Sequence, residues 1–204
     1  MGAQKYPQAS TTAWYQEKYP GTGMEPDRIV LHTTESTALP GYQGGAIAPN
    51  LTAVPDLRKK RLTWYQHFDF GTSSRALADT PGGVRTNRQG AAQVELVGTC
   101  DPVTHDKWRA AGHGYVFWPE APEWALEGLA AFLRWAHGEH GIPLSGPEKW
   151  PPYPESYGNG GGQRLGAEEW ESFRGICGHM HVPENDHGDP GALAIGRLLE
   201  LAGE

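Results

Sequence analysis

The chain has 204 residues, of which 38% are hydrophobic and 20% charged, so it is long enough for one ordinary soluble domain with its own core. Its net charge of −7 excludes nucleic acid as a partner held by phosphate contacts, because no basic stripe is available to neutralise a backbone. The one compact basic run, at residues 58–61, is interpreted as a solvated loop or helix end.

Cysteine content and hydropathy exclude two further classes of protein. The two cysteines, Cys100 and Cys177, are too few for a disulfide framework; we expect two buried free thiols, with a single disulfide as the alternative. No apolar run approaches the ~18 residues of a membrane span, which argues against membrane insertion. The N-terminus lacks the charged-then-apolar layout of a signal peptide, so we expect something else to carry or release a protein that works outside the membrane.

The chain begins with a polar segment, residues 1–27, that has no sustained period. We expect it to form an N-terminal arm lying on the domain, anchored by Trp14 and Tyr15. The β-branched apolar run at 28–32 then predicts a buried strand covered on both faces, and this strand ends at His32.

The middle of the chain predicts two more strands. Alternating residues at 64–70 and a second run at 92–97 are typical of strands, and Pro81-Gly82-Gly83 predicts a turn between them. The segment 51–60 receives no assignment.

The C-terminal half adds the helices. Apolar residues at three- and four-residue spacing predict a helix over about 122–139, ended by Gly141 and Pro143. A long Pro/Tyr/Gly loop at 149–166, a strand at 176–182 and a helix at 192–201 follow. Strands separated by helices and long connections predict an α/β fold, with a central mixed sheet flanked by helices in a single domain, residues 28–204.

Four potential metal ligands lie within eleven residues near the C-terminus: His179, His181, His187 and Asp189. Imidazole and carboxylate together suit zinc, whose catalytic sites use three protein ligands and one open position. Taken alone, the cluster could equally be a polar loop. His32 favours a metal site, because a histidine at the end of a buried strand needs a partner.

These residues occur in an order that resembles a known family, the zinc-dependent N-acetylmuramoyl-L-alanine amidases. That family includes phage endolysins, muropeptide-recycling amidases and peptidoglycan-recognition proteins. The resemblance covers residues 27–200, and its most specific motif is Gly178-His179 followed by Asp189-Pro190-Gly191. Three strand segments also match: Arg28-Ile-Val-Leu-His32-Thr-Thr, Gln66-His67-Phe68, and Gln93-Val94-Glu95-Leu96-Val97-Gly98.

The resemblance implies a role for each of five residues. His32, His179 and Asp189 would bind zinc at one edge of the sheet, and Glu95 would be the catalytic carboxylate. His187 falls where many members place a catalytic lysine. A histidine in place of that lysine changes the expected pH dependence of activity more than the expected reaction, because histidine titrates near neutrality and lysine does not.

Several residues near this site have competing interpretations. His181 is the main rival ligand, because on a regular strand it would share a face with His179, and the resemblance favours His179. We expect His67 to be a packed or hydrogen-bonded residue. Trp150, Tyr153 and Tyr157 either offer flat faces to substrate or simply pack the long loop.

The implied activity is hydrolysis of the amide bond between N-acetylmuramic acid and L-alanine, with peptidoglycan as partner and a monomer as the default state. Phage endolysin is the favoured setting, held in the host cytoplasm until release, and a bacterial recycling amidase is the alternative. A non-catalytic peptidoglycan-recognition module is the rival from another class, although such modules typically lack a ligand. A zinc peptidase is weaker, because no His-Glu-x-x-His motif is present.

Overall fold

A six-stranded mixed sheet forms the centre of the protein in a computed structural model that describes residues 2–77, 79, 83–88 and 90–204. The strand order is β1-β4-β3-β5-β2-β6, and every neighbouring pair is parallel except β3 and β4. The strands are β1 (Ala9–Ser10), β2 (Arg28–Thr33), β3 (Leu51–Asp56), β4 (Arg61–Gln66), β5 (Ala91–Leu96) and β6 (Gly175–Gly178). The expected α/β class with a mixed sheet is confirmed.

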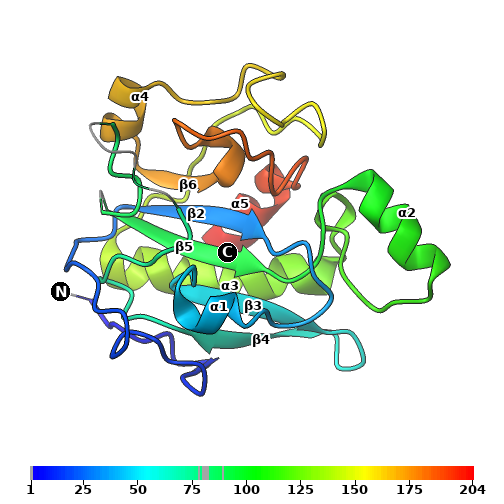
Figure 1. The fold of residues 1–204 in the computed structure, drawn as a ribbon, viewed down its shortest axis with the longest axis horizontal. Coiled ribbons are helices and arrows are strands. Elements are labelled where there is room, and N and C mark those ends of the chain that lie inside the picture. Colours follow the sequence, from blue (N-terminus) through cyan, green and yellow to red (C-terminus); the bar gives the residue numbers. More distant parts are fainter. Residues whose placement is uncertain (1, 78, 80–82, 89) are drawn as a thin grey trace.

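Helices lie on both sides of this sheet (Figure 1). They are α1 (Tyr42–Gly45), α2 (Pro102–Ala110), α3 (Glu123–His140), α4 (Ala167–Ser172) and α5 (Ile195–Gly203), with single 3-10 turns at Trp118–Glu120 and His179–His181. In Figure 1, α3 and α5 lie behind the sheet, α1 lies in front of it, and α2 stands away from the body. None of the helices in the described ranges is both long and apolar enough to cross a bilayer.

The long helix α3 forms because its apolar residues share one face. Leu126, Leu129 and Leu133 recur at helical spacing and are buried against the sheet and α5. The helix ends at Gly141, which adopts φ 71° and donates its backbone N–H to the carbonyl of His137 at 2.8 Å. Both the helix and its glycine stop agree with the sequence prediction.

Other boundaries differ from the prediction. The strand expected over 64–70 ends at Gln66, and the one expected over 176–182 ends at Gly178 and continues as the 3-10 turn. The unassigned segment 51–60 contains β3, and α2 and α4 were not predicted at all. The turn expected at Pro81-Gly82-Gly83 falls mostly outside the described residues.

The N-terminus of helix α2 has a capping residue that is recognisable in the sequence. The carboxylate of Asp101 accepts the backbone N–H groups of Val103 and Thr104, and Pro102 occupies the first helical turn. No residue of α2 is buried, so the helix lacks the apolar stripe by which helices are usually recognised.

The N-terminal residues contribute to the core. Tyr6 is buried, and its ring contacts those of Trp64, Phe132 and Trp135 at centroid distances of 5.2–5.5 Å. Its hydroxyl oxygen is buried with no hydrogen-bond partner among the described residues, and burial raises the pKa of the phenol to about 12.

We expect Tyr6→Ala to lower the free energy of unfolding by about 3 kcal/mol, because truncation leaves a cavity among three aromatic rings. Tyr6→Phe is the matched control and should be neutral or stabilising, because it removes only the unpaired hydroxyl. Urea denaturation of both variants measures the difference. Equal losses would show that the ring itself contributes little.

Candidate metal centre

The first candidate ligand, His32, lies near the carboxyl end of β2. This strand is entirely buried and pairs in parallel with β5 on one side and β6 on the other. Parallel pairing places the carboxyl ends of all three strands at the same end of the sheet. His32 therefore faces Glu95 of β5 in register, and β6 ends beside it at Gly178.

The second ligand, His179, begins the 3-10 turn that follows β6. Gly178 immediately before it is required by packing, because a Cβ there would lie 2.6 Å from Pro190 Cδ and 3.1 Å from the Trp150 ring. The close approach of these segments brings the turn bearing Asp189 against the end of β6. The backbone N–H of Met180 donates to the carbonyl of Asp189 at 2.9 Å and links the two.

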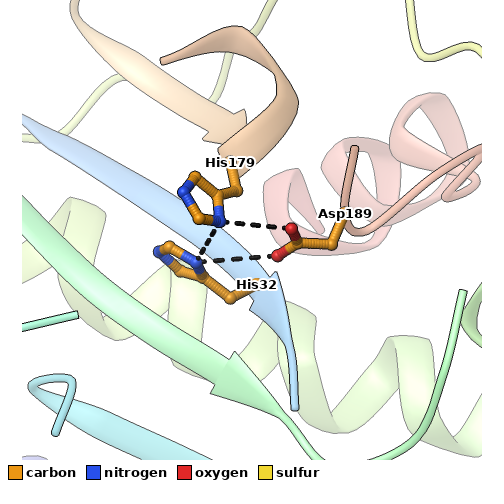
Figure 2. Close-up of side chains that lie close together, drawn as sticks. All are labelled: His32, His179 and Asp189. Atoms are coloured by element: carbon orange, nitrogen blue, oxygen red, sulfur yellow. Dashed lines mark hydrogen bonds and ion pairs between the residues drawn. The ribbon is translucent and has the colours of Figure 1, made fainter. Parts of the chain in front are cut away.

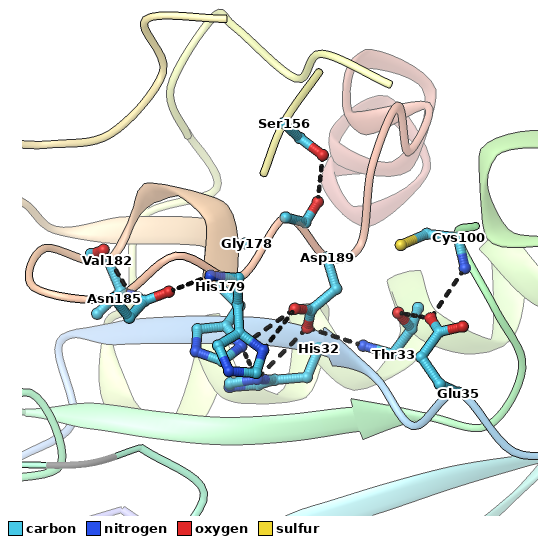
Figure 3. Close-up of polar contacts among 12 residues, drawn as sticks. His32, Thr33, Glu35, Cys100, Ser156, Gly178, His179, Val182, Asn185 and Asp189 are labelled. Carbon is cyan, nitrogen blue, oxygen red and sulfur yellow. Dashed lines mark hydrogen bonds and ion pairs between the residues drawn. The ribbon is translucent and has the colours of Figure 1, made fainter. Parts of the chain in front are cut away.

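The third ligand, Asp189, is held from two sides (Figure 3). Its Oδ2 accepts the backbone N–H of Thr33 at 3.1 Å. The peptide before it is fixed by Ser156, whose buried hydroxyl donates to the carbonyl of Gly188 at 2.6 Å. The carboxylate is thus oriented by β2 on one side and by the 149–166 loop on the other.

The three side chains converge on one point (Figure 2). His32 Nδ1 lies 3.0 Å from His179 Nδ1 and 3.6 Å from Asp189 Oδ2, and His179 Nδ1 lies 3.1 Å from Asp189 Oδ1. Zinc bonds of about 2.0–2.2 Å in a tetrahedral arrangement require donor separations of about 3.3–3.5 Å. The observed separations of 3.0–3.6 Å are within about 0.3 Å of these values, and the donors are of the kind that zinc prefers, so the group can hold a metal ion.

Electrostatics keep His32 and Asp189 in their metal-binding protonation states. Burial and the neighbouring His179 lower the pKa of His32 to about 3, so its ring is neutral. Burial opposes ionisation of Asp189, yet the imidazoles, His179 above all, hold its pKa well below the usual range. Neutral imidazole and ionised carboxylate are the forms that ligate zinc.

Glu95 lies on β5 directly beside His32, and its carboxyl group is close enough to Asp189 to be affected by its charge. Its Oε2 is buried and has no hydrogen-bond partner among the residues the structure describes. Burial, with the nearby carboxylates of Asp189 and Glu35, raises the pKa of Glu95 to about 8. An unpaired carboxyl with a near-neutral pKa is suited to accept or donate a proton during catalysis.

His187 lies at the mouth of the site. Its ring stacks on that of His179 at a centroid distance of 4.2 Å, and its Nδ1 lies 3.7 Å from Asp189 Oδ1. The Asp189 carboxylate raises the pKa of His187, which favours the protonated ring, while the side chain stays largely exposed. It can therefore offer a proton to a group bound in front of the ligands.

A cleft of about 710 Å³ opens onto these groups. Its walls come from β2, β5, α1, the segment after β4 and the turn after β6. They include Thr33, Tyr42, Arg75, Leu77, Glu95, His179 and His187. The cleft connects the ligand His179, together with Glu95 and His187, to solvent.

Tyr42 was not predicted to belong to the site, although it lines the cleft. Its hydroxyl begins a buried hydrogen-bonded chain to Thr52 (2.7 Å) and then His67 (2.9 Å), whose Nδ1 lies 2.7 Å from the carbonyl of Ala13. Because that carbonyl can only accept, the His67 proton is on Nδ1, Thr52 donates to Nε2, and Tyr42 donates to Thr52. The lone pairs of the Tyr42 oxygen are left for a cleft occupant.

Glu35 was also not predicted to contribute near the site. Its carboxylate accepts hydrogen bonds from the hydroxyls of Thr33 (2.7 Å) and Thr99 and from the backbone of Cys100 (3.1 Å). It joins the end of β2 to the segment before α2, and its own backbone adopts φ 49°. An acidic residue in a polar tail gives no signal of such contacts in the sequence.

Two further histidines near the site are structural. His67 is fully buried at the end of the hydrogen-bonded chain that begins at Tyr42, as expected. His181 is buried too. Its Nδ1 accepts the Gly178 N–H at 2.9 Å and its Nε2 faces the Lys149 carbonyl at 2.8 Å. The prediction that His179 and His181 would share a strand face is wrong, because the 3-10 turn directs them apart.

The 149–166 loop packs behind the ligands. Trp150 is half-buried against the His181 ring, and Ser156 braces the Asp189 turn. Trp150, Tyr153 and Tyr157 are not among the residues that line the cleft. Both cysteines are buried free thiols, as predicted.

No family model matches the chain, and no curated protein matches it. Among solved structures, a mutant structure of PlyL is similar at 13% identity and a TM-score of 0.49, over 97% of this chain and 96% of that chain. A likeness of this degree says nothing of activity. The functional conclusion therefore depends on the geometry of the site.

We expect the protein to bind one divalent ion per chain and Asp189→Ala to abolish that binding, because two imidazoles remain without their anionic partner. Isothermal titration with Zn²⁺ measures both. His67→Gln, a buried histidine outside the cluster, is the control and should retain the ion. Tight binding by Asp189→Ala would rule out this set of ligands.

Stability of the metal-free protein should fall as the pH drops from about 6.5 to about 4. Burial lowers the pKa values of both His67 and His181 to about 4, below the unfolded value of 6.5, so the unfolded state binds more protons in this window. Each buried histidine then contributes a slope of about 1.4 kcal/mol per pH unit. Above pH 6.5 both histidines are neutral in the folded and in the unfolded state, so their contribution to the slope vanishes.

Denaturation of His67→Gln across that range should give a slope shallower by about 1.4 kcal/mol per pH unit than the wild type. His113→Gln, which changes an exposed histidine, is the matched control and should leave the slope unchanged. An unaltered slope in His67→Gln would show that His67 titrates normally in the folded protein.

Proposed function

We propose that this protein is a zinc-dependent N-acetylmuramoyl-L-alanine amidase, which hydrolyses the amide bond between N-acetylmuramic acid and L-alanine in peptidoglycan. The observation that carries the proposal is the convergence of His32, His179 and Asp189 beside a cleft that Glu95 lines, with the Glu95 Oε2 unpaired among the described residues. The sequence motifs that resemble this family supply the same four residues.

The metal proposed for the site is zinc. Two imidazoles and one carboxylate match the donor sets of catalytic zinc, and three protein ligands are offered by the described residues, which leaves a position open for water. When bound, zinc would polarise the scissile carbonyl and activate water for attack on it. The remaining catalytic work falls to the side chains that face the cleft.

Glu95 is assigned the role of general base. A carboxylate whose pKa is raised toward neutrality can take a proton from water and later return it to the departing amine of L-alanine. Its orphaned Oε2 gives the acceptor position, because no protein group competes for that oxygen in the described part of the chain.

His187 is assigned the stabilisation of the oxyanion that forms when the lactyl carbonyl is attacked. Its raised pKa favours the cationic ring, and stacking on His179 sets that ring in front of the ligands. A preorganised donor at this position stabilises the transition state more than the ground state. The Tyr42 oxygen, which lines the same cleft, offers an acceptor to the substrate.

The proposed partner is peptidoglycan, bound as glycan strand plus stem peptide by a monomer. The biological setting favoured is that of a phage endolysin that lyses the cell wall after release from the host cytoplasm. A bacterial recycling amidase acting on small muropeptides is the alternative setting for the same chemistry.

We expect the purified protein to release new N-terminal alanine from insoluble peptidoglycan, and a zinc chelator to abolish the release. Mass spectrometry of the digested wall detects that terminus. Binding to the wall without alanine release, even with added Zn²⁺, would instead establish a non-catalytic recognition module.

Two variants separate the assigned roles in the same assay. Glu95→Gln should reduce the rate by about 10²–10⁴-fold, the usual contribution of a general base. His187→Ala should reduce it by about 10²-fold, as when one oxyanion donor is lost. Both should bind Zn²⁺ as the wild type does, and full activity in either would remove that residue from the mechanism.

A further inference from the structure

Gln93 touches a metal ligand although nothing in the proposed mechanism uses it. It lies on β5 two residues before Glu95, so both side chains point to the same face of the sheet. The side chain is fully buried, and its Oε1 lies 2.8 Å from His32 Nε2. This contact is on the side of the imidazole away from His179 and Asp189, which His32 faces through Nδ1.

The contact decides where the His32 ring carries its proton. An amide oxygen can only accept, so Nε2 must donate, and in the neutral ring Nδ1 is then left with a free lone pair. That lone pair is directed at the point where the three ligands meet. The opposite tautomer would place a proton there and prevent His32 from binding a metal.

The orientation of the Gln93 amide is itself fixed by its surroundings. Its Nε2 lies 3.5 Å from the carbonyl oxygen of Ala91. Rotating the amide by 180° would bring its oxygen against that carbonyl and turn its NH₂ group toward His32. Two facing carbonyl oxygens repel each other, so only one orientation both satisfies the amide and leaves His32 able to ligate.

Asn50 braces Gln93 from the main chain. Its Oδ1 accepts the Gln93 N–H at 2.9 Å, and its own N–H donates to the Gln93 carbonyl at 3.0 Å. The Asn50 amide also donates to the carbonyls of Asp69 and Thr72, at 3.2 and 2.8 Å. A buried network thus runs from the metal ligand through β5 to the segment that leads into the cleft wall.

We propose that Gln93 is a positioning residue that holds His32 in its Nε2–H tautomer and so presents Nδ1 to the metal. The neutral amide does this without adding a further buried negative charge beside Asp189. The inference depends on the metal centre within the proposed function and not on the reaction, so metal binding tests it independently of hydrolysis.

The first test is the affinity of the protein for Zn²⁺, measured by competition with a chelating indicator. Gln93→Met keeps the volume and removes the acceptor, and we expect it to weaken binding about 10–100-fold, the usual effect of losing such a partner. Gln66→Met is the matched control. Gln66 is an equally buried, hydrogen-bonded glutamine on β4 that touches no ligand, and its substitution should leave Zn²⁺ affinity unchanged.

The second test reads the tautomer directly. In metal-free protein, long-range ¹H–¹⁵N NMR should show the His32 proton on Nε2 in the wild type and a mixture of tautomers in Gln93→Met. Gln93→Glu restores an acceptor and should return both the tautomer and most of the affinity. If Gln93→Met does not fold, the wild-type spectrum still decides, because a proton on Nδ1 there would overturn the proposal.

The outcomes separate this inference from the proposed function. Weaker Zn²⁺ binding by Gln93→Met alone supports the inference even if the wild type releases no alanine from peptidoglycan. Unchanged Zn²⁺ affinity in Gln93→Met overturns it even if the wild type is an active amidase. Equal losses of Zn²⁺ affinity in Gln93→Met and Gln66→Met would show that Gln93 acts only through packing.

Discussion

The metal centre depends on the parallel pairing of β2 with both β5 and β6. That pairing aligns the carboxyl ends of three strands at one end of the sheet. His32 on β2, Glu95 on β5 and the turn after β6 therefore lie close together. All six residues of β2 are buried, which fixes its register against both neighbours. A slip of one residue would turn His32 to the opposite face of the sheet.

Polar groups are buried at the metal centre because each one has either a hydrogen-bond partner or a proposed catalytic role. Asp189 remains ionised among imidazoles and accepts a backbone N–H, and His32 remains neutral between Gln93 and the other ligands. Glu95 differs, since one of its oxygens is left without a partner in the described chain and its pKa rises to about 8. An unsatisfied buried carboxyl costs stability, and such costs tend to be retained where they serve function.

The ligands are surrounded by a hydrogen-bonded frame drawn from the whole chain. Gln93 and Asn50 fix His32, whereas Thr33 and Ser156 fix Asp189 and the peptide before it. The long loop at 149–166 is part of this frame, because its contacts with the Asp189 turn lie behind the ligands and away from the cleft. Its length therefore reflects the irregular path needed to brace a turn as much as any contact with substrate.

Much of this fold could be predicted from residue patterns alone. The period of α3 and its glycine stop, the buried run ending at His32, and the strand carrying Glu95 are local features, set by side-chain alternation and backbone preference within a few residues. The choice of His32, His179 and Asp189 as a group came from motif resemblance, and the structure brings these three together. Helix α2 was not predicted because none of its residues is buried, although its N-cap Asp101 and the following Pro102 were present in the sequence.

What only the tertiary structure decided is how residues distant in sequence meet. Spacing could not separate His179 from His181; the 3-10 turn does, by directing one toward His32 and the other toward the Lys149 carbonyl. Gln93, Tyr42 and Glu35 are ordinary polar residues in the sequence and gain their roles from partners on other elements. Local pattern records which face of an element is buried, whereas hydrogen-bond partners and charge environments arise only when separate elements pack together.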